Sequence, residues 1–434
     1  MSLSRRRFIG GTAGAAGLYL LSPAFARAGR AMGIGADPAL ADRRRLVVLF
    51  LGGGNDGLNT VVPVADVAGA ARASVYRKLR PSLGYAPEQT LPLDRPADGP
   101  HGLGLSPSLP YLHGLYREGR VAVVQGVDYP NHSYSHFSST TVWHTGEPDR
   151  STSGWVGRHL DRAGASEGEV RAVGIGNGLP AILRGDSRQG LGIVNIPSTT
   201  FADGNDKNVN SKLRHDALAR FGGHPAAEEL RALHGRTSDA TVGLVRNLSE
   251  TQVPAATGSA LADRLVTARL LLEEDIGVEV VYLEHAGFDT HANQRTRQEQ
   301  LLADLDASLG MFWTGQLGGK QVMPAMSAHL AERTMVMTLS EFGRRIGENG
   351  AGAGSGTDHG AASPLFLIGP PGAASPLVGG VHGDHPDMGS VALPADNLAM
   401  TTDLRRVYEA VLTNWLGNPD PLYRRHAPLP GLFR

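Results

Sequence analysis

Residues 46–56 read LVVLFLGGGND, an unbroken apolar run that ends in three glycines and two polar residues. A run of this kind is typical of a strand buried on both faces, as in a parallel sheet covered by helices. Four further apolar runs follow along the chain. They are Val121–Val124, Val278–Leu283, Thr334–Leu339 and Leu365–Ile368. The sequence therefore predicts one doubly wound α/β sheet that contains these five strands and is flanked by helices.

Two helices and one insertion are predicted around this sheet. Apolar residues recur at helical spacing after Thr402 or Asp403, either of which can cap the helix, and Gly417 stops the pattern. A second helix is predicted from about Leu261 to Asp275. Residues from about 180 to 254 are richer in Asn, Ser, Gly and charge and have weaker periodicity. We expect an insertion or cap there, within one domain that spans residues 45–420.

Composition excludes several classes of protein. The chain has 434 residues and a net charge of −1, so it has no large basic surface for nucleic acid, and we expect no nucleic-acid partner. It has no cysteine, which removes disulfides, zinc ribbons, iron–sulfur clusters and cysteine nucleophiles together. Its 16 histidines remain as candidate metal ligands.

The first 28 residues are typical of a twin-arginine export signal. Arg5, Arg6 and Arg7 precede a weakly apolar stretch, and small residues follow at Ala24 to Ala28. The apolar stretch is shorter than the roughly 20 residues that span a bilayer. We therefore expect cleavage near residue 26 or 28 and no permanent membrane span. The protein is expected in the periplasm or outside the cell after passage through the twin-arginine translocation machinery.

Polar clusters lie next to the predicted strands. Because ligands of open α/β sheets bind at the carboxyl ends of the strands, these clusters are candidates for one site. The last cluster precedes its strand, so it reaches the same rim if that strand is antiparallel. The residues concerned are Asp56, Asp289, His291, Glu341, Arg344, Asp358 and His359.

Carboxylates and imidazoles brought together from distant segments are typical of a divalent-metal site. We expect Asp56, Asp289, His291, Glu341 and His359 to be ligands, and zinc suits this set best, with manganese, calcium or magnesium as alternatives. Structural interpretations stay open for each residue. Asp56 can stabilise the glycine turn, Asp289 can cap the next helix, and Glu341 can pair with Arg344. Asp358 either orients a ligand or is a turn residue.

Five motifs occur in order along the chain. They are Gly53-Gly54-Asn55-Asp56-Gly57-Leu58-Asn59, Ser135-His136-Phe137, Phe288-Asp289-Thr290-His291, Ser340-Glu341-Phe342-Gly343-Arg344 and Thr357-Asp358-His359-Gly360. Together they resemble the DUF1501 family of exported bacterial proteins, a family that is itself similar to the alkaline phosphatase and sulfatase superfamily. This resemblance implies an alkaline-phosphatase-like α/β domain with insertions and a metal-assisted site for phosphate or sulfate esters.

The resemblance also implies roles in catalysis. The segment from Ser135 to Gly146 is similar to the helix that follows the nucleophile of alkaline phosphatases, which places the nucleophile at Ser135 or, by strict spacing, at His136. His132 or His136 would act as acid or base, and Arg344 would clamp the anionic group. The expected substrate is an ester, either a small molecule or a polymer.

The chain also departs from the superfamily. Glu341-Phe342 stands where the superfamily usually has Asp-His or Asp-Asn, and the sulfatase motif Cys or Ser-x-Pro-x-Arg is not found outside the signal. Gly52-x-Gly54-x-x-Gly57 matches a dinucleotide fingerprint, but neither a good helix start nor an acid about 20 residues on follows it. The alternative to a hydrolase or transferase is a catalytically degenerate envelope protein that binds a metal or a partner.

Overall fold

The computed structural model describes residues 43–67, 71–94, 101–147, 153–163, 170–194, 253–273, 277–372, 375–388, 397–418 and 420–434. The predicted export signal and residues 195–252 of the predicted insertion lie outside these ranges. None of the helices in the described ranges combines the length and the apolar character that a membrane crossing requires.

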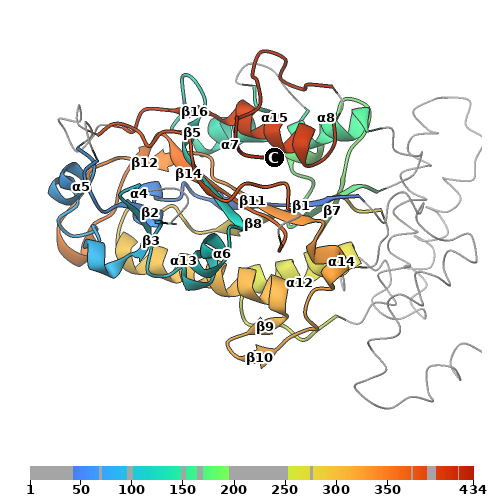
Figure 1. Ribbon diagram of the computed structural model, residues 1–434, viewed down its shortest axis with the longest axis horizontal. Helices are drawn as coiled ribbons and strands as arrows, with labels where there is room; N and C mark the ends of the chain where they lie inside the picture. Colours follow the sequence, from blue (N-terminus) through green and yellow to red (C-terminus); the bar gives the residue numbers. More distant parts are fainter. Residues whose placement is uncertain are drawn as a thin grey trace, which may run out of the picture.

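A mainly parallel sheet forms the centre of the molecule (Figure 1). Strand β1 (Arg45–Gly52) runs parallel to β11 (Thr334–Leu339) on one side and to β8 (Val280–Ala286) on the other. The strand order is β15-β5-β14-β11-β1-β8-β6-β7, with β16 also paired to β5. The remaining strands are β5 (Val121–Asp128), β6 (Ala172–Ile175), β7 (Leu191–Ile193), β14 (Ser363–Ile368), β15 (Gly380–His382) and β16 (Thr402–Asp403).

All five predicted strands lie in this one sheet, which confirms a mixed α/β fold with helices on the sheet. One boundary of the predicted insertion was wrong, because β7 falls inside residues 180–254 and pairs in parallel with β6. Strand β7 has only three residues, Leu191 to Ile193, and the middle one is a glycine. That is too short a run to separate an edge strand from a loop by periodicity.

Helices cover both faces of the sheet (Figure 1). Helices α7 (His136–Thr145), α8 (Trp155–Arg162) and α15 (Leu404–Asn414) lie on one face. Helices α6 (Pro110–Arg117), α12 (Ala260–Glu273) and α13 (Gln294–Thr314) lie on the other. Both predicted helices are present, as α12 and α15. Asp403 caps α15 by accepting a hydrogen bond from the Arg405 amide.

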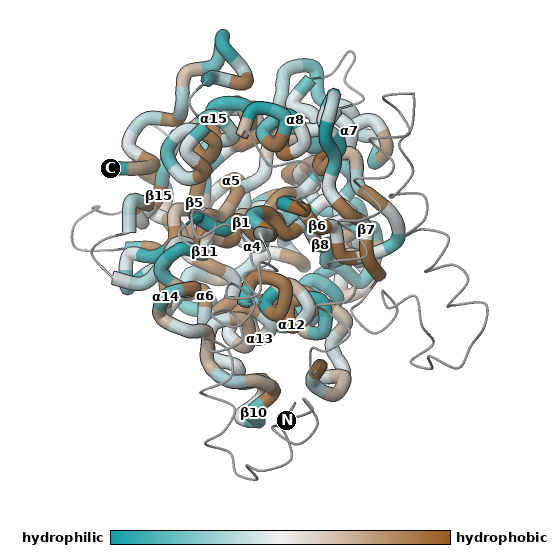
Figure 2. The backbone as a smooth tube through the Cα atoms, turned by 90° about the vertical axis from the view of Figure 1, so that its right-hand side faces the viewer, coloured by the Kyte–Doolittle hydropathy of each residue, from teal (hydrophilic) through white to brown (hydrophobic). Residues whose placement is uncertain are grey.

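Alternate residues of β1 face the two layers. Val47, Leu49 and Leu51 belong to the hydrophobic cluster under α12 and α13, whereas Leu46, Val48 and Phe50 belong to the cluster under α7, α8 and α15. Figure 2 shows the apolar strands enclosed between the helices. Burial on both faces explains why the run at 46–51 contains no polar residue.

Smaller elements complete the described ranges. They are α4 (Gly57–Thr60), β2 (Val61–Pro63), α5 (Ala73–Leu79), η1 (Pro87–Gln89), β3 (Leu91–Pro92), β4 (Leu103–Leu105), η2 (Ala181–Leu183), β9 (Gln316–Leu317), β10 (Lys320–Gln321), α14 (Ala328–Ala331), β12 (Gly343–Arg344), η3 (Gly352–Gly354) and β13 (His359–Gly360).

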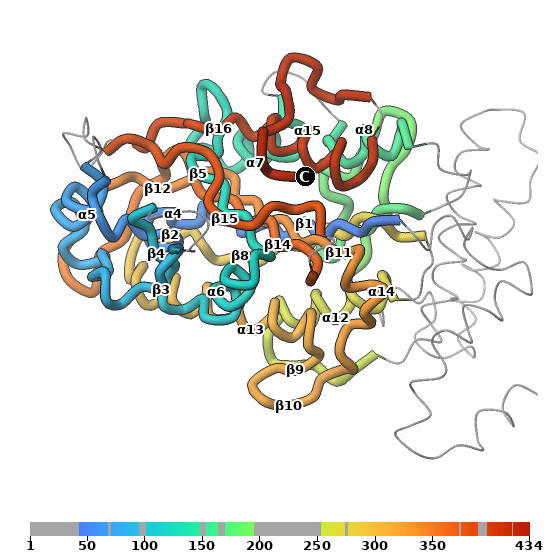
Figure 3. The backbone as a smooth tube through the Cα atoms, viewed as in Figure 1, coloured from blue at the N-terminus to red at the C-terminus, as the bar shows by residue number. Residues whose placement is uncertain are grey.

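The topology brings distant segments to one rim of the sheet. Strands β1, β8 and β11 are parallel, so their carboxyl ends meet there. Strand β14 is antiparallel to both β11 and β5, so the residues that precede it arrive at the same rim, as expected. Strands β12 and β13 then pair, which places Arg344 opposite His359. Figure 3 shows the N-terminal strand β1 beside β11 and β14 from late in the chain.

Candidate metal centre

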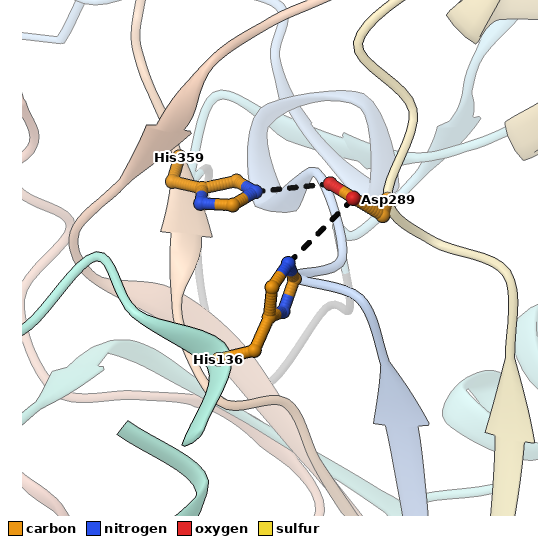
Figure 4. A group of neighbouring side chains, drawn as sticks. All are labelled: His136, Asp289 and His359. Atoms are coloured by element: carbon orange, nitrogen blue, oxygen red, sulfur yellow. Dashed lines mark hydrogen bonds and ion pairs between the residues drawn. The ribbon is translucent and has the colours of Figure 1, made fainter. Parts of the chain in front are cut away.

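Asp289 lies at the centre of a histidine cluster on this rim (Figure 4). It follows β8, and its Oδ1 is 2.9 Å from His359 Nε2 and 3.0 Å from His291 Nε2. Its Oδ2 is 3.6 Å from His136 Nε2. The Nε2 atoms of His291 and His359 are themselves 3.0 Å apart. Asp289, His136 and His359, from three separate segments, each bring a ligand atom within 4.8 Å of the other two, and His291 lies against Asp289 and His359.

Two of these imidazoles are held from behind through their other nitrogen. His136 Nδ1 donates to Glu341 Oε1 at 2.8 Å, and His359 Nδ1 donates to the backbone oxygen of Tyr134 at 2.9 Å. A proton on Nδ1 leaves the Nε2 lone pair free. Both free Nε2 atoms are the ones that face Asp289.

His291 is held in the same way. Its Nδ1 lies 3.4 Å from Asp358 Oδ1, and the Asn349 side-chain amide donates to the same Asp358 oxygen at 3.0 Å. Asp358 is therefore fixed by one neighbour while it orients another. A carboxylate or carbonyl behind each ring is the usual support of metal-binding histidines.

Each of the three imidazoles thus lies between two acceptors, one behind it and Asp289 in front. A neutral imidazole has one N–H and can serve only one of them. Three protonated rings so close together would repel one another. A divalent cation between Asp289, His136 and His359 would satisfy the Nε2 lone pairs of these two rings and the carboxylate at once, and this donor set suits zinc.

Asp289 is ionised at any pH near neutrality. Partial burial pushes its pKa upward, but the close contact with the His359 ring, the hydrogen bond from Arg344 and the charges of Arg344 and His291 outweigh that and lower the pKa to about 2. Its side chain is 47% exposed, so the carboxylate is open to a ligand from solvent.

Gly53 allows β1 to approach the Asp289 loop. Its φ is +116°, and a Cβ on it would lie 2.3 Å from the Asp289 amide nitrogen. Only glycine combines that backbone angle with that contact. The first of the sequence motifs therefore shapes the centre through its backbone.

Arg344 does not clamp an anion, contrary to the sequence-based expectation. Its side chain is fully buried, and its guanidinium donates to the backbone oxygens of Gly54, Thr357, Gly53 and Phe288. It also donates to Asp289 Oδ1 at 2.9 Å. These bonds use the donors that a substrate anion would need, so Arg344 positions Asp289.

Asp56 is not brought into the cluster either, contrary to the expectation. Its buried carboxylate pairs with Arg80 Nη1 at 2.5 Å, accepts from the Leu58 amide at 3.2 Å and accepts from the Gln294 side chain. Gln294 in turn accepts from Thr357 Oγ1 at 2.6 Å. Asp56 therefore caps α4 and supports the loop that carries Asp358 and His359.

Asp289, His291 and His359 are brought together as expected, whereas Glu341 and Asp358 stand behind histidines. His136, expected in catalysis, lies in the cluster in which Asp56 was expected. Sequence reasoning missed the backbone oxygen of Tyr134, for which no side-chain signal exists.

Ser135 and His132 lie in the segment that leads into His136. Ser135 is exposed and precedes α7, and its hydroxyl makes no capping bond to that helix. His132 Nε2 is 2.9 Å from the Tyr134 hydroxyl, and its Nδ1 is 3.9 Å from Asp128. No contact joins His132 to the Asp289 cluster within the described residues.

A cavity of about 690 Å³ adjoins the centre. His136 and Glu341 belong to its wall, together with the buried residues His144 and Tyr282. It also contains Glu284, which lies near the end of β8 and was missed as a site residue although it follows an apolar run. Partial desolvation and then the nearby Glu341 raise the pKa of Glu284.

Because His144 is buried, we expect the fold to lose stability in acid. Burial lowers its pKa from 6.5 to about 4, so the native ring stays neutral at a pH where the unfolded chain takes up a proton. The contribution of His144 to the free energy of unfolding is therefore fully present above pH 6.5. It is lost as the pH drops toward 4, by on the order of 1 kcal/mol per pH unit. Urea unfolding across this range measures it.

Burial also lowers the pKa of His385 to about 4, so His385 adds a similar dependence of the unfolding free energy on pH. The variant His144→Gln should lose the part of this pH dependence that His144 contributes. The variant His329→Gln, at an exposed position, should keep all of it. An unchanged pH dependence in His144→Gln would contradict the assignment.

A family described as a protein of unknown function (DUF1501) matches residues 123–408. The matched range contains Asp289, all three histidines, Glu341 and Arg344. No curated protein matches the chain.

Proposed function

The chain belongs to the DUF1501 family, and on that premise we propose that it is an exported, metal-dependent hydrolase or transferase acting on a phosphate or sulfate ester. The observation that carries the proposal is the set of three imidazoles, each held between an acceptor behind it and Asp289 in front. We further propose that the sheet has the alkaline-phosphatase-like arrangement and that residues 1–28 direct export. Cell fractionation of the full chain tests the export.

Asp289, His136 and His359 would hold the ion, with His291 Nε2 facing it and a fourth position left open. A divalent ion there would polarise an ester oxygen and favour deprotonation of a hydroxyl or water beside it. Glu341 and the Tyr134 carbonyl keep two of the rings aimed, and Arg344 keeps Asp289 ionised and fixed. The exposed side of Asp289 leaves an approach for the ester.

Ser135 is the favoured nucleophile. Its hydroxyl is exposed, is free of a capping bond and lies at the N-terminus of α7, where the helix dipole favours an anion. His136 is engaged at both nitrogens, by Glu341 and by the cluster, which argues against a phosphohistidine intermediate.

Zinc-loaded protein should turn over at least one class among phosphate monoesters, phosphate diesters and sulfate esters. Ser135→Ala should lower kcat by at least about 1,000-fold, as removal of a nucleophile does, while its metal content stays unchanged. Ser138→Ala, exposed on the same helix, is the matched control and should keep its activity. Full activity of Ser135→Ala would move the role to a water molecule.

A second candidate function is an envelope protein that binds a metal or a partner without turnover. The specific observation in its favour is Arg344, because the guanidinium that would stabilise an anionic ester is buried and engaged by the backbone. Bound metal with no turnover on any of the three ester classes would favour this candidate.

A further inference from the structure

Glu341 lines the cavity beside the metal centre, and one of its carboxylate oxygens is buried without a partner. The Glu341 side chain is 3% exposed, and its Oε1 accepts from His136 Nδ1 and from the Gly53 amide, both at 2.8 Å. Its Oε2 is buried and has no hydrogen-bond partner. Leaving such an oxygen unpaired is costly, so a ligand that donates to it gains correspondingly.

A second carboxylate lies on the same cavity. Strand pairing places Glu284 opposite Phe50 on β1. Gly52 leaves room for Glu284, because a Cβ on Gly52 would lie 2.3 Å from Glu284 Oε1. Arg264 also lines the cavity, but its guanidinium donates to the backbone oxygen of Glu284. Within the described residues no ion pair joins Arg264 to either carboxylate.

Aromatic side chains complete the cavity. Phe50 and Tyr282 are buried in its wall, and Phe137 is 88% exposed at the first turn of α7. Phe137 thus lines the same cavity as the two carboxylates, and an aromatic face can contact a cation that has an organic part.

We propose that this cavity binds the primary ammonium group of a small organic ligand, with Glu341 Oε2 as its buried acceptor and Glu284 as the second negative charge. This deepens the function proposed above. It rests on that function in one respect, namely that the ligand is the amine-bearing part of an ester whose anionic group lies at the metal centre. His136 separates the two sites by the width of one imidazole ring, since Nε2 faces Asp289 and Nδ1 faces Glu341.

Charge and size distinguish this ligand from two others. A neutral polyol would satisfy the hydrogen bond of Glu341 but add no positive charge, so two carboxylates would share the charge of Arg264 alone. A bare metal ion would compensate them, yet about 690 Å³ is the size of a small-molecule site. An alkyl or aryl ammonium supplies N–H donors, positive charge and apolar contact with the aromatic side chains.

The test compares benzylamine with benzyl alcohol, its neutral analogue, on the full chain after metal has been removed with a chelator. Titration calorimetry should give at least about tenfold tighter binding of benzylamine, because a charge-assisted hydrogen bond is added. Glu341→Gln, which places an amide donor in the cavity, should remove this preference. Glu284→Gln should reduce it, and Glu332→Gln, exposed near the opposite end of β11, should keep it.

Equal binding of the two probes, or a preference unchanged in both Glu284→Gln and Glu341→Gln, would overturn the proposal. Because Glu284 is exposed, its variant should fold even where Glu341→Gln does not. The measurement is made without metal or ester, so amine binding can succeed where ester turnover fails. Binding of zinc alone in the cavity, with no amine preference, would also overturn it.

Discussion

Asp289→Ala should abolish high-affinity zinc binding. Asp289 is the residue that His136, His291 and His359 all face, and it supplies the negative charge that a divalent cation needs. Loss of a supporting residue behind a ligand typically costs 10- to 100-fold in metal affinity, so loss of this central ligand should cost more than about 100-fold. Competition between the chelator-stripped protein and a fluorescent zinc indicator measures the affinity.

Three variants bracket this result. Glu341→Ala removes only the acceptor behind His136 and should weaken zinc by about 10- to 100-fold. Glu332→Ala removes an exposed acid far from the centre and should leave zinc affinity unchanged. Asp56→Asn, which keeps the size of the side chain, should leave the zinc stoichiometry at the wild-type value. Wild-type zinc affinity in Asp289→Ala would contradict the metal centre.

Arg344→Met should destabilise the fold by about 3 to 5 kcal/mol, because it leaves four backbone oxygens without their donor in a buried position. The methionine is of similar length but donates no hydrogen bond. Urea unfolding monitored by circular dichroism measures the change in unfolding free energy.

The matched control is Arg297→Met on the exposed side of α13, which should change stability by less than about 0.5 kcal/mol. Arg344→Lys should also be strongly destabilising, since one ammonium cannot reach oxygens on the Gly53, Phe288 and Thr357 segments together. If Arg344→Met unfolds at the wild-type urea concentration, Arg344 is not the structural link between these segments.

The sheet could be predicted because its central strands are buried on both faces. That burial makes residues such as Leu46 to Leu51 continuously apolar, a pattern that local sequence reveals. The short edge strand β7 could not be predicted, because three residues are too few to show an alternation of apolar and polar positions. The sequence left the direction of β14 open. This direction determines the site, because an antiparallel β14 brings His359 to the rim.

The site could be predicted in part, for a physical reason. Asp289, His291 and His359 follow or precede strands whose ends must meet, so their convergence follows from topology. The partners of Arg344 and Asp56 could not be predicted, because burial and hydrogen bonding to backbone oxygens depend on tertiary packing. The role of His136 depends on Glu341, which lies 205 residues away in sequence.

The most direct test of the metal centre is an anomalous difference map at the zinc edge from crystals of the chelator-stripped protein reloaded with zinc. The account predicts one strong peak about 2.0 to 2.2 Å from an Asp289 oxygen and from the Nε2 atoms of His136 and His359, with His291 Nε2 facing it. A zinc peak bound elsewhere, or no peak at this rim in zinc-saturated crystals, would contradict it.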